Sequence, residues 1–313
     1  LSLVGSEMCI RDRKLLGQPA LNAQLIETNF LNAKLKNLKL SVTHLSKYLR
    51  CPLTYYFENV LQVPTARSPS MGFGSAIHYA LDHLFKKMKE SGTGDFPSKD
   101  AFYWYFQTGM EHSASHFTEK EYTDKLEYAQ KLLPQYYDYY FNRWNKKVVT
   151  EYRPGNIFID EIPLAGALDK IEFLDSSTVN VVDYKTGDPS NIRKKLMRPL
   201  AEVDPESTKF EELYGGDYWR QMVFYKILLD NDKTKHWNMI SGEVDFIEKR
   251  NAKEFTKEKL LITENDCQLV KAQIHEVYSG ILSHNFTGCG KEDCQWCNFV
   301  RNNYKTEVVM EED

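Results

Sequence analysis

The sequence predicts an α/β fold, with a central mixed sheet of moderate size flanked by helices. Residues 41–147 carry apolar side chains mainly at helical spacing, whereas residues 156–184 form β-branched and aromatic runs that nearly alternate with polar residues. A helical pattern at 217–229 then comes before a strand-like run at 241–247. Strands followed by a helix and another strand predict a sheet covered by helices.

The N-terminal half is predicted to be largely helical. One helix begins at Ser41 or Thr43, either of which can cap it, and continues through 41–59. Residues 72–89 show a clean apolar stripe, and residues 99–147 are helical and unusually aromatic. Three further segments are less regular: 21–40 (helix or linker), 62–71 (a Pro-containing loop) and 92–98 (a break between helices).

The second half is predicted to begin as a strand meander at 156–163, 165–174 and 178–184. A basic, Pro-containing loop follows at 187–216, and a last helix is expected at 264–283. As domains, we expect a tail or linker (1–39), one domain (40–303) with a helical insertion at about 95–150, and an acidic tail (304–313). Residues 1–13 match no element and could be an artefactual extension or the edge of a longer polypeptide.

Composition excludes two classes of protein. No apolar run in the 313 residues approaches the roughly 18 to 20 needed to cross a bilayer. The net charge of −4 argues against nucleic-acid binding through bulk positive potential, so any such binding needs local basic patches. Nothing at the start resembles a signal peptide, and we expect a cytoplasmic location.

Two strand segments hold the most informative residues. Asp183 and Lys185 are two apart and share one face of their strand. If residues 175–177 form a hairpin loop, paired residue numbers sum to 352 and Asp169 faces Asp183. Opposed carboxylates repel each other, and a divalent cation such as Mg²⁺ relieves that repulsion. Such a site, with Lys185 beside it, suits metal-assisted phosphodiester hydrolysis; the alternative is a solvated surface pair.

This G-x-x-D strand followed by D-x-K-T-G resembles the PD-(D/E)XK nuclease superfamily, in particular its RecB/AddB-type branch. Three other segments match in the expected order: the lead-in L-S-V-T-H-L-S-K-Y-L-R-C-P, the helix G-F-G-S-A-I-H-Y-A-L with His78, and W-R-Q-M-V-F-Y with Gln221 and Tyr225. The resemblance covers roughly residues 40 to 300.

The resemblance implies a restriction-endonuclease-like core that cuts DNA with Mg²⁺ or Mn²⁺. It places the metal on His78, Asp169 and Asp183, with the Tyr184 carbonyl as a further ligand. Lys185 would orient the attacking water. Gln221 and Tyr225 would contact DNA or brace the site.

The cysteines indicate a second metal site. Cys289, Cys294 and Cys297 are spaced C-x4-C-x2-C, and Cys51 is a distant fourth thiol. Four thiolates could hold a [4Fe–4S] cluster or zinc, and a site without metal also remains open. Iron–sulfur members of the resembled branch join the two ends of the domain with one early and three late cysteines. Their common late spacing is C-x2-C-x5-C, from which this chain departs. Cys9 and Cys267 are expected to be free thiols.

A basic run after the D-x-K strand could add affinity for DNA through counterion release, or could simply be solvated. Its members are Arg193, Lys194, Lys195 and Arg198. Aromatic residues at 103–106 and 136–144 could stack on bases, but their helical spacing favours a core role. The chain lacks a G-x-x-x-x-G-K-[ST] loop and therefore an ATP-driven motor of that type.

Together these observations predict a metal-dependent deoxyribonuclease, acting on single strands or ends as an exonuclease in DNA repair or recombination. The ending C-G-K-E-D-C-x-W-C-x-F resembles UvrD/Rep-like helicase–nuclease fusions, so a helicase in cis or in trans is an expected partner. Three alternatives remain: a free-standing nuclease, a non-catalytic DNA-binding or scaffolding module, and a cluster-bearing redox or zinc module.

Overall fold

A five-stranded mixed sheet forms the centre of the computed structural model, which describes residues 28–66, 68–202, 209–250 and 254–303. Its strand order is β1-β4-β5-β6-β7, and only β5 and β6 pair in parallel. The strands are β1 (Val148–Tyr152), β4 (Leu168–Phe173), β5 (Thr178–Lys185), β6 (Asn238–Arg250) and β7 (Glu254–Leu261). The predicted mixed α/β class is confirmed.

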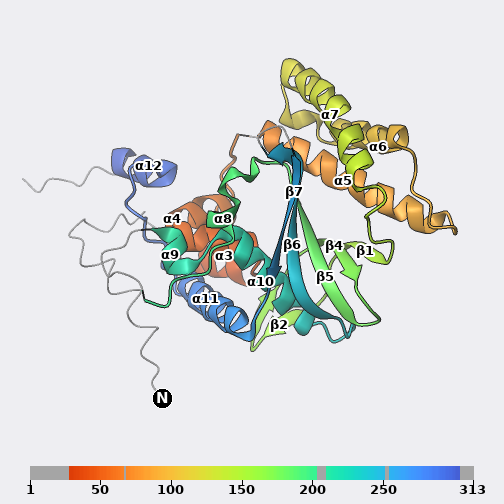
Figure 1. Cartoon of the computed structure of the whole chain (residues 1–313). Coiled ribbons are helices and arrows are strands. Elements are labelled where there is room, and N and C mark those ends of the chain that lie inside the picture. Colours follow the sequence, from red (N-terminus) through yellow and green to blue (C-terminus); the bar gives the residue numbers. More distant parts are fainter. Residues whose placement is uncertain (1–27, 67, 203–208, 251–253, 304–313) are drawn as a thin grey trace, which may run out of the picture.

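Two groups of helices cover opposite faces of this sheet (Figure 1). One group is α5 (Pro69–Glu90), α6 (Lys99–His112) and α7 (Glu119–Tyr140), with a short 3₁₀ turn at Ala114–His116. The other contains α3 (Val42–Arg50), α10 (Asp217–Asp230) and α11 (Glu264–Leu282). Alternate side chains of β5 serve the two faces: Val181 lies in the core beneath α10 and α11, whereas Val182 and Tyr184 lie in the core beneath α5 to α7.

The parallel pairing of β5 and β6 requires a crossover between them. The predicted loop at 187–216 forms the first half of that crossover, and its described residues contain three short helical turns. These are Pro189–Asn191, α8 (Ile192–Lys195) and α9 (Phe210–Tyr214). Helix α10 completes the crossover and packs on β6.

The N-terminal helices match the predicted pattern. Ser41, one of the two proposed caps, accepts a hydrogen bond from the His44 amide and starts α3. The helix ends at Cys51, because Pro52 begins the separate α4 (Pro52–Tyr55), which a π-helical turn extends over Tyr56–Val60. Of the segment 21–40, predicted to be a helix or a linker, the part Thr28–Leu35 forms helix α2. Residues 21–27 lie outside the described part.

Two expectations about individual elements were wrong, and two elements were not foreseen. The strand expected at 156–163 is a separate hairpin, β2 (Ile157–Ile159) with β3 (Ile162–Leu164). Its run is broken by Asp160, which turns the chain with a φ of 52°. The helical stretch expected to 147 ends at Tyr140. Strand β7 and the C-terminal helix α12 (Gln295–Asn303) were not foreseen.

The aromatic residues expected to be core are mostly buried, including Tyr105, Phe106, Tyr136 and Trp144, whereas Trp104 is 60% exposed. No helix within the described residues is long and apolar enough to cross a bilayer.

Candidate active site

The β4–β5 hairpin has the register that the sequence predicted. Lys170 pairs with Val182 and Ile171 with Val181, so partner numbers sum to 352. Asp175 sets the turn, because its Oδ1 accepts hydrogen bonds from the amides of Ser177 and Thr178 at 2.8 and 2.7 Å. One step further along the same register, Asp169 lies across from Asp183.

Asp183 and Lys185 form a close pair at the C-terminal end of β5. The Lys185 Nζ lies 2.6 Å from Asp183 Oδ2, and the Asp183 residue is only 1% exposed. Burial raises the pKa of Asp183, and the repulsion from Asp169 adds to this while Lys185 opposes it. Burial alone would lower the pKa of Lys185, but attraction to Asp183 outweighs it and the pKa is raised. The ammonium group is therefore retained at neutral pH.

His78 joins this site from α5. Its Nδ1 lies 3.4 Å from Asp169 Oδ1, and its Nε2 lies 3.2 Å from the Tyr184 carbonyl oxygen. The other oxygen of Asp169 accepts the Tyr184 amide at 2.9 Å. Burial acts to lower the pKa of His78, but Asp169 raises it to about 9. In the metal-free site a proton on this imidazole partly offsets the negative charge of the carboxylates, and it must leave before the ring can bind a cation.

Gln221 and Tyr225 reach the site from one face of α10. Gln221 Nε2 donates to Asp183 Oδ1 at 2.8 Å, and its Oε1 accepts from Lys185 Nζ at 3.0 Å. The Tyr225 hydroxyl donates to the same Asp183 oxygen at 3.0 Å. Of the two roles considered for this pair, these contacts favour bracing the carboxylate.

Sequence reasoning missed one acidic residue, Glu151. The β1–β4 register pairs Thr150 with Lys170 and Tyr152 with Leu168, which carries Glu151 to the position across from Asp169. Its backbone is left-handed, with a φ of 48°, which is uncommon for a residue with a side chain. Ligand atoms of Glu151, His78 and Asp169 all lie within 4.8 Å of one another. Burial raises the pKa of Glu151, and repulsion from Asp169 adds to this.

The donor set fits a hard divalent cation. It combines carboxylate oxygens, one imidazole nitrogen and a backbone carbonyl at a partly buried position, which are ligands that suit Mg²⁺ or Mn²⁺. Ligand atoms of His78, Asp169 and the unforeseen Glu151 form one group. Asp183 stands beside this group, with its Oδ1 held by Gln221 and Tyr225 and its Oδ2 by Lys185.

Comparison with protein families identifies the superfamily. A family model described as the PD-(D/E)XK nuclease superfamily matches residues 39–301. The chain belongs to this superfamily. Two solved structures are similar to it over 89% of its length. One is a Eubacterium rectale protein with a provisional exonuclease designation (11% identity, TM-score 0.48, 94% of that chain covered). The other is SSO0001 (12% identity, TM-score 0.34, 93% covered). No curated protein matches.

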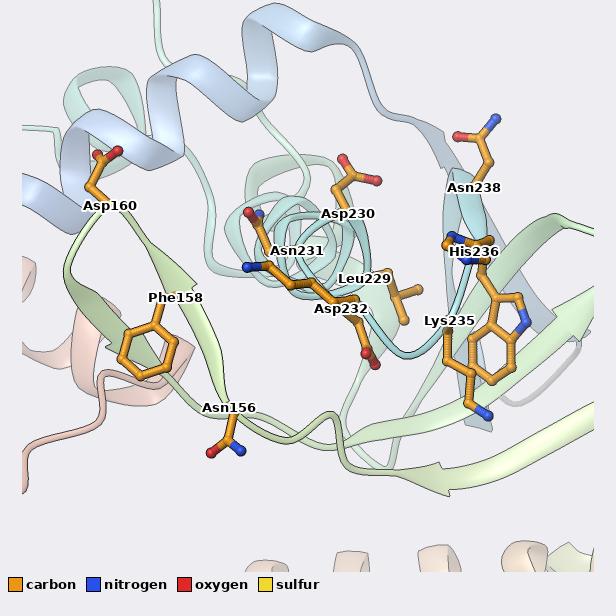
Figure 2. A pocket seen from close by; sticks show the side chains of 12 residues that line it. Asn156, Phe158, Asp160, Leu229, Asp230, Asn231, Asp232, Lys235, His236 and Asn238 are labelled. Carbon is orange, nitrogen blue, oxygen red and sulfur yellow. The ribbon is translucent and has the colours of Figure 1, made fainter.

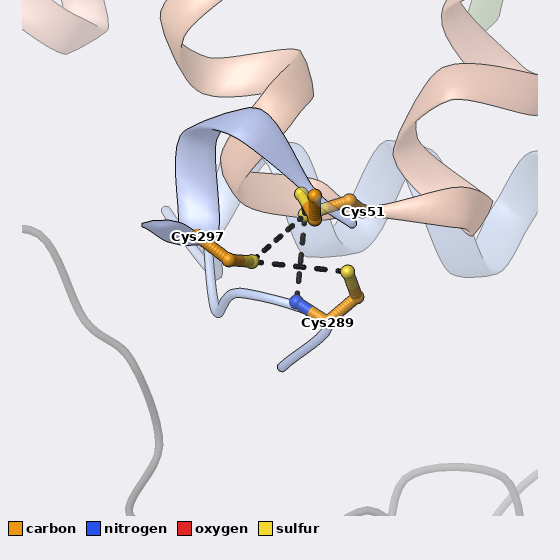
Figure 3. Close-up of side chains that lie close together, drawn as sticks. Cys51, Cys289 and Cys297 are labelled. Carbon is orange, nitrogen blue, oxygen red and sulfur yellow. Dashed lines mark hydrogen bonds between the residues drawn. The ribbon is translucent and has the colours of Figure 1, made fainter. Parts of the chain in front are cut away.

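The four cysteines of this superfamily member come together as predicted. Figure 3 shows Cys51, Cys289 and Cys297 of this group. The Sγ atoms of Cys51 and Cys297, of Cys289 and Cys297, and of Cys294 and Cys51 are each 3.8 Å apart. Hydrogen bonds from the thiols of Cys289 and Cys297 hold the pKa of Cys51 well below its usual range. The four sulfur atoms lie close enough together to bind one metal, and the lowered pKa of Cys51 favours the thiolate form that binds metals.

The remaining cysteines do not join them. Cys267 is buried in α11 and is a free thiol, as expected, and burial raises its pKa to about 11. Cys9 lies outside the described residues.

The four residues of the basic run have different partners in the structure. Arg198 makes a two-pronged ion pair with Asp266 at 2.7 and 2.9 Å, so its guanidinium is committed within the fold. Lys194 pairs with Glu211 at 3.2 Å, and Arg193 is exposed. Lys195 donates to the Tyr218 hydroxyl at 3.0 Å. The Lys185 ammonium also lies over the Tyr218 ring, 5.1 Å from its centroid, which connects Lys195 to the site.

An open groove of about 850 Å³ lies elsewhere on the nuclease fold (Figure 2). Asn238, the first residue of β6, lines it, whereas Asp183 and Lys185 lie at the far end of the neighbouring parallel strand. Phe158 and Asp160 of the β2–β3 hairpin form another side of the groove. None of the predicted site residues lines it.

Proposed function

We propose that this protein is a metal-dependent deoxyribonuclease whose metal is held by His78, Asp169 and Asp183. The observation that carries the proposal is the buried Asp183 carboxylate paired with Lys185 and set across from Asp169, in a chain of the PD-(D/E)XK nuclease superfamily. The Tyr184 carbonyl and the Glu151 carboxylate complete the proposed ligand set.

A divalent ion bound there would polarise the scissile phosphate and lower the pKa of an attacking water. The chain's own groups prepare the site for this. Gln221 and Tyr225 fix the orientation of Asp183 through its Oδ1. Lys185, held by Asp183 Oδ2 and Gln221 Oε1, keeps a positive charge where a phosphate would gain negative charge, and orients the water.

For the substrate we propose DNA, cut as single strands or from ends in repair or recombination, with a helicase as partner. The motif order and the C-G-K-E-D-C-x-W-C-x-F ending support this proposal. Exposed Arg193 and Lys194 follow the D-x-K strand and could meet a phosphate backbone. We treat 40–303 as one nuclease domain, which the family match over 39–301 supports.

For the four-cysteine site we propose a [4Fe–4S] cluster, with zinc as the alternative. Four sulfur ligands suit both, and neither spacing nor geometry separates them. Iron and sulfide analysis together with the visible absorption of anaerobically purified protein distinguishes the two.

Cleavage of end-labelled single- and double-stranded DNA with Mg²⁺ or Mn²⁺ tests the proposed activity. Wild type should cut, whereas Lys185→Ala and Asp183→Ala should lose cutting while keeping their circular dichroism spectra. If wild type and both variants cut equally, the activity does not belong to this site. If none cuts while DNA binding persists, the non-catalytic binding module is the better description.

A further inference from the structure

Arg220 is a fully buried arginine on α10 whose guanidinium uses all of its donors. Its residue is 0% exposed. A guanidinium has five N–H groups, and five hydrogen bonds are present. Nε donates to Gln273 Oε1 at 2.9 Å. Nη1 donates to Ser46 Oγ and Asp217 Oδ1, both at 3.1 Å. Nη2 donates to the carbonyl oxygens of Tyr214 and Gly215 at 2.8 and 2.9 Å.

These bonds hold several elements together at one point. Ser46 belongs to α3, Gln273 to α11, and Tyr214 and Gly215 to the end of α9. The start of α10 has no side-chain cap of its own, since its N-cap is Gly216. Arg220 therefore fixes the first turn of α10 against its neighbours.

Gln221 follows Arg220 directly, and consecutive helix residues point about 100° apart. Arg220 faces α3 and α11, whereas Gln221 faces the sheet. The Gln221 amide contacts both Asp183 and Lys185. Because Arg220 holds α10 in place, it also sets the position of the Gln221 side-chain amide between Asp183 and Lys185. Buried, saturated hydrogen-bond networks are rigid, and small displacements at such a site are costly to catalysis.

The same network reaches the four cysteines. Asp217 accepts from Arg220 through Oδ1 and from Arg50 through Oδ2. Arg50 directly precedes Cys51, which ends α3. The ring of Phe210 contacts both guanidinium groups, 4.2 Å from Arg50 and 5.3 Å from Arg220 to the ring centroid. The Asp217 carboxylate and the Phe210 ring therefore connect the C-terminal end of α3, next to Cys51, to the first turn of α10.

We propose that Arg220 is a positioning residue of the nuclease site, and that Asp217, shared with Arg50, makes the position of Gln221 depend on metal at the four cysteines. This inference rests on the proposed nuclease activity. Metal on Cys51 holds the end of α3 and hence Arg50. Loss of that metal releases this end, and the change reaches Gln221 through Asp217 and Arg220.

The first experiment compares wild type with Arg220→Lys. Lysine keeps the charge but offers three donors in place of five, so some of the acceptors around it lose their partner. We expect kcat to fall by about tenfold to a hundredfold with KM little changed. The metal content of the cysteine site should stay at the wild-type value. The matched control is Lys226→Gln, which breaks an ion pair with Asp230 in the last turn of the same helix and should leave kcat unchanged.

A purely structural role for Arg220 predicts a different pattern. The melting temperature of Arg220→Lys would then fall while kcat of the folded fraction stayed at the wild-type value, and the positioning role would be rejected. An inactive wild type is a separate outcome, because it contradicts the proposed activity itself.

The second experiment tests the link to the cysteines. Metal is stripped from them by chelation under reducing conditions, and Mn²⁺, which thiolates bind poorly, is then restored for catalysis. Wild type should lose kcat by about tenfold, whereas Asp217→Asn, which has already lost the link, should lose much less. Equal losses in both proteins would overturn the link. If stripping unfolds the protein, Arg50→Gln breaks the same link while the cysteine site keeps its metal. It should lower kcat as Asp217→Asn does, and an unchanged kcat would overturn the link.

Discussion

Glu151 lies across β1 and β4 from Asp169, and both are within reach of His78. Two acidic side chains at this spacing repel each other unless a cation lies between them. The raised pKa of Glu151 reflects this repulsion together with burial. Glu151 therefore gives the sharpest test of where the metal binds.

We expect Glu151→Gln to weaken Mn²⁺ binding by about tenfold, because it removes one negative charge from the ligand set. The same change relieves repulsion with Asp169, so the metal-free protein should be equally stable or slightly more so. Titration calorimetry and thermal melting measure the two effects. Glu161→Gln, in the exposed turn between β2 and β3, is the control. An unchanged Mn²⁺ affinity would place Glu151 outside the ligand set.

Tyr225→Phe should lower kcat while KM changes little. The substitution deletes one of the two hydrogen bonds that orient Asp183 Oδ1, and such a bond contributes about 0.5 to 1.5 kcal/mol. An effect of that size on the barrier corresponds to a fall of up to about tenfold. Steady-state cleavage kinetics measure it, with Tyr139→Phe on the exposed side of α7 as control. A KM effect alone would instead indicate that Tyr225 contacts DNA.

Asp266 should make folding stability depend on acid pH. Burial opposes its ionisation, but hydrogen bonds from Arg198, the Thr263 amide and Trp219 outweigh burial and lower its pKa to about 2. The pKa in the unfolded chain is about 3.9. The stabilisation is therefore complete above about pH 4 and is lost as the pH falls towards 2.

Its size should be on the order of 1 to 2 kcal/mol, since the Arg198 partner is partly exposed to solvent. Urea unfolding between pH 5 and pH 2.5 measures the dependence. In Asp266→Asn the slope with pH should be smaller than in wild type. If the two slopes coincide, other carboxylates account for the acid sensitivity.

Cys294→Ser should abolish stoichiometric metal binding at the four-cysteine site and lower the melting temperature, because metal-binding energy contributes to folding. Cys267→Ala should keep the metal, since this thiol lies apart in α11. Metal analysis and calorimetry of both variants give the comparison. A Cys294→Ser protein with full metal content would show that the ligand set is different.

Much of the site could be predicted from the sequence because it follows from local rules. The turn at Asp175 and strand alternation place Asp169 against Asp183, and helical spacing places Gln221 beside Tyr225. Glu151 escaped notice because β1 is short, lies at the sheet edge and follows a long aromatic helix, so its five residues carry no periodic signal. Arg198 was expected either to contact DNA or to be solvated, and its ion pair with Asp266 could not be foreseen because the two residues are distant in the sequence.

The cysteine site also affects how the chain can be made. Cys51 and Cys297 are separated by 246 positions, and the structure brings their sulfur atoms together. On the ribosome, Cys51 therefore emerges well before Cys297, its last partner in the site, is synthesised. Closing so distant a contact costs loop entropy that only late-forming interactions offset. Metal loading is thus expected only after residue 297 has been synthesised, so that chains truncated before this residue cannot complete the four-cysteine site.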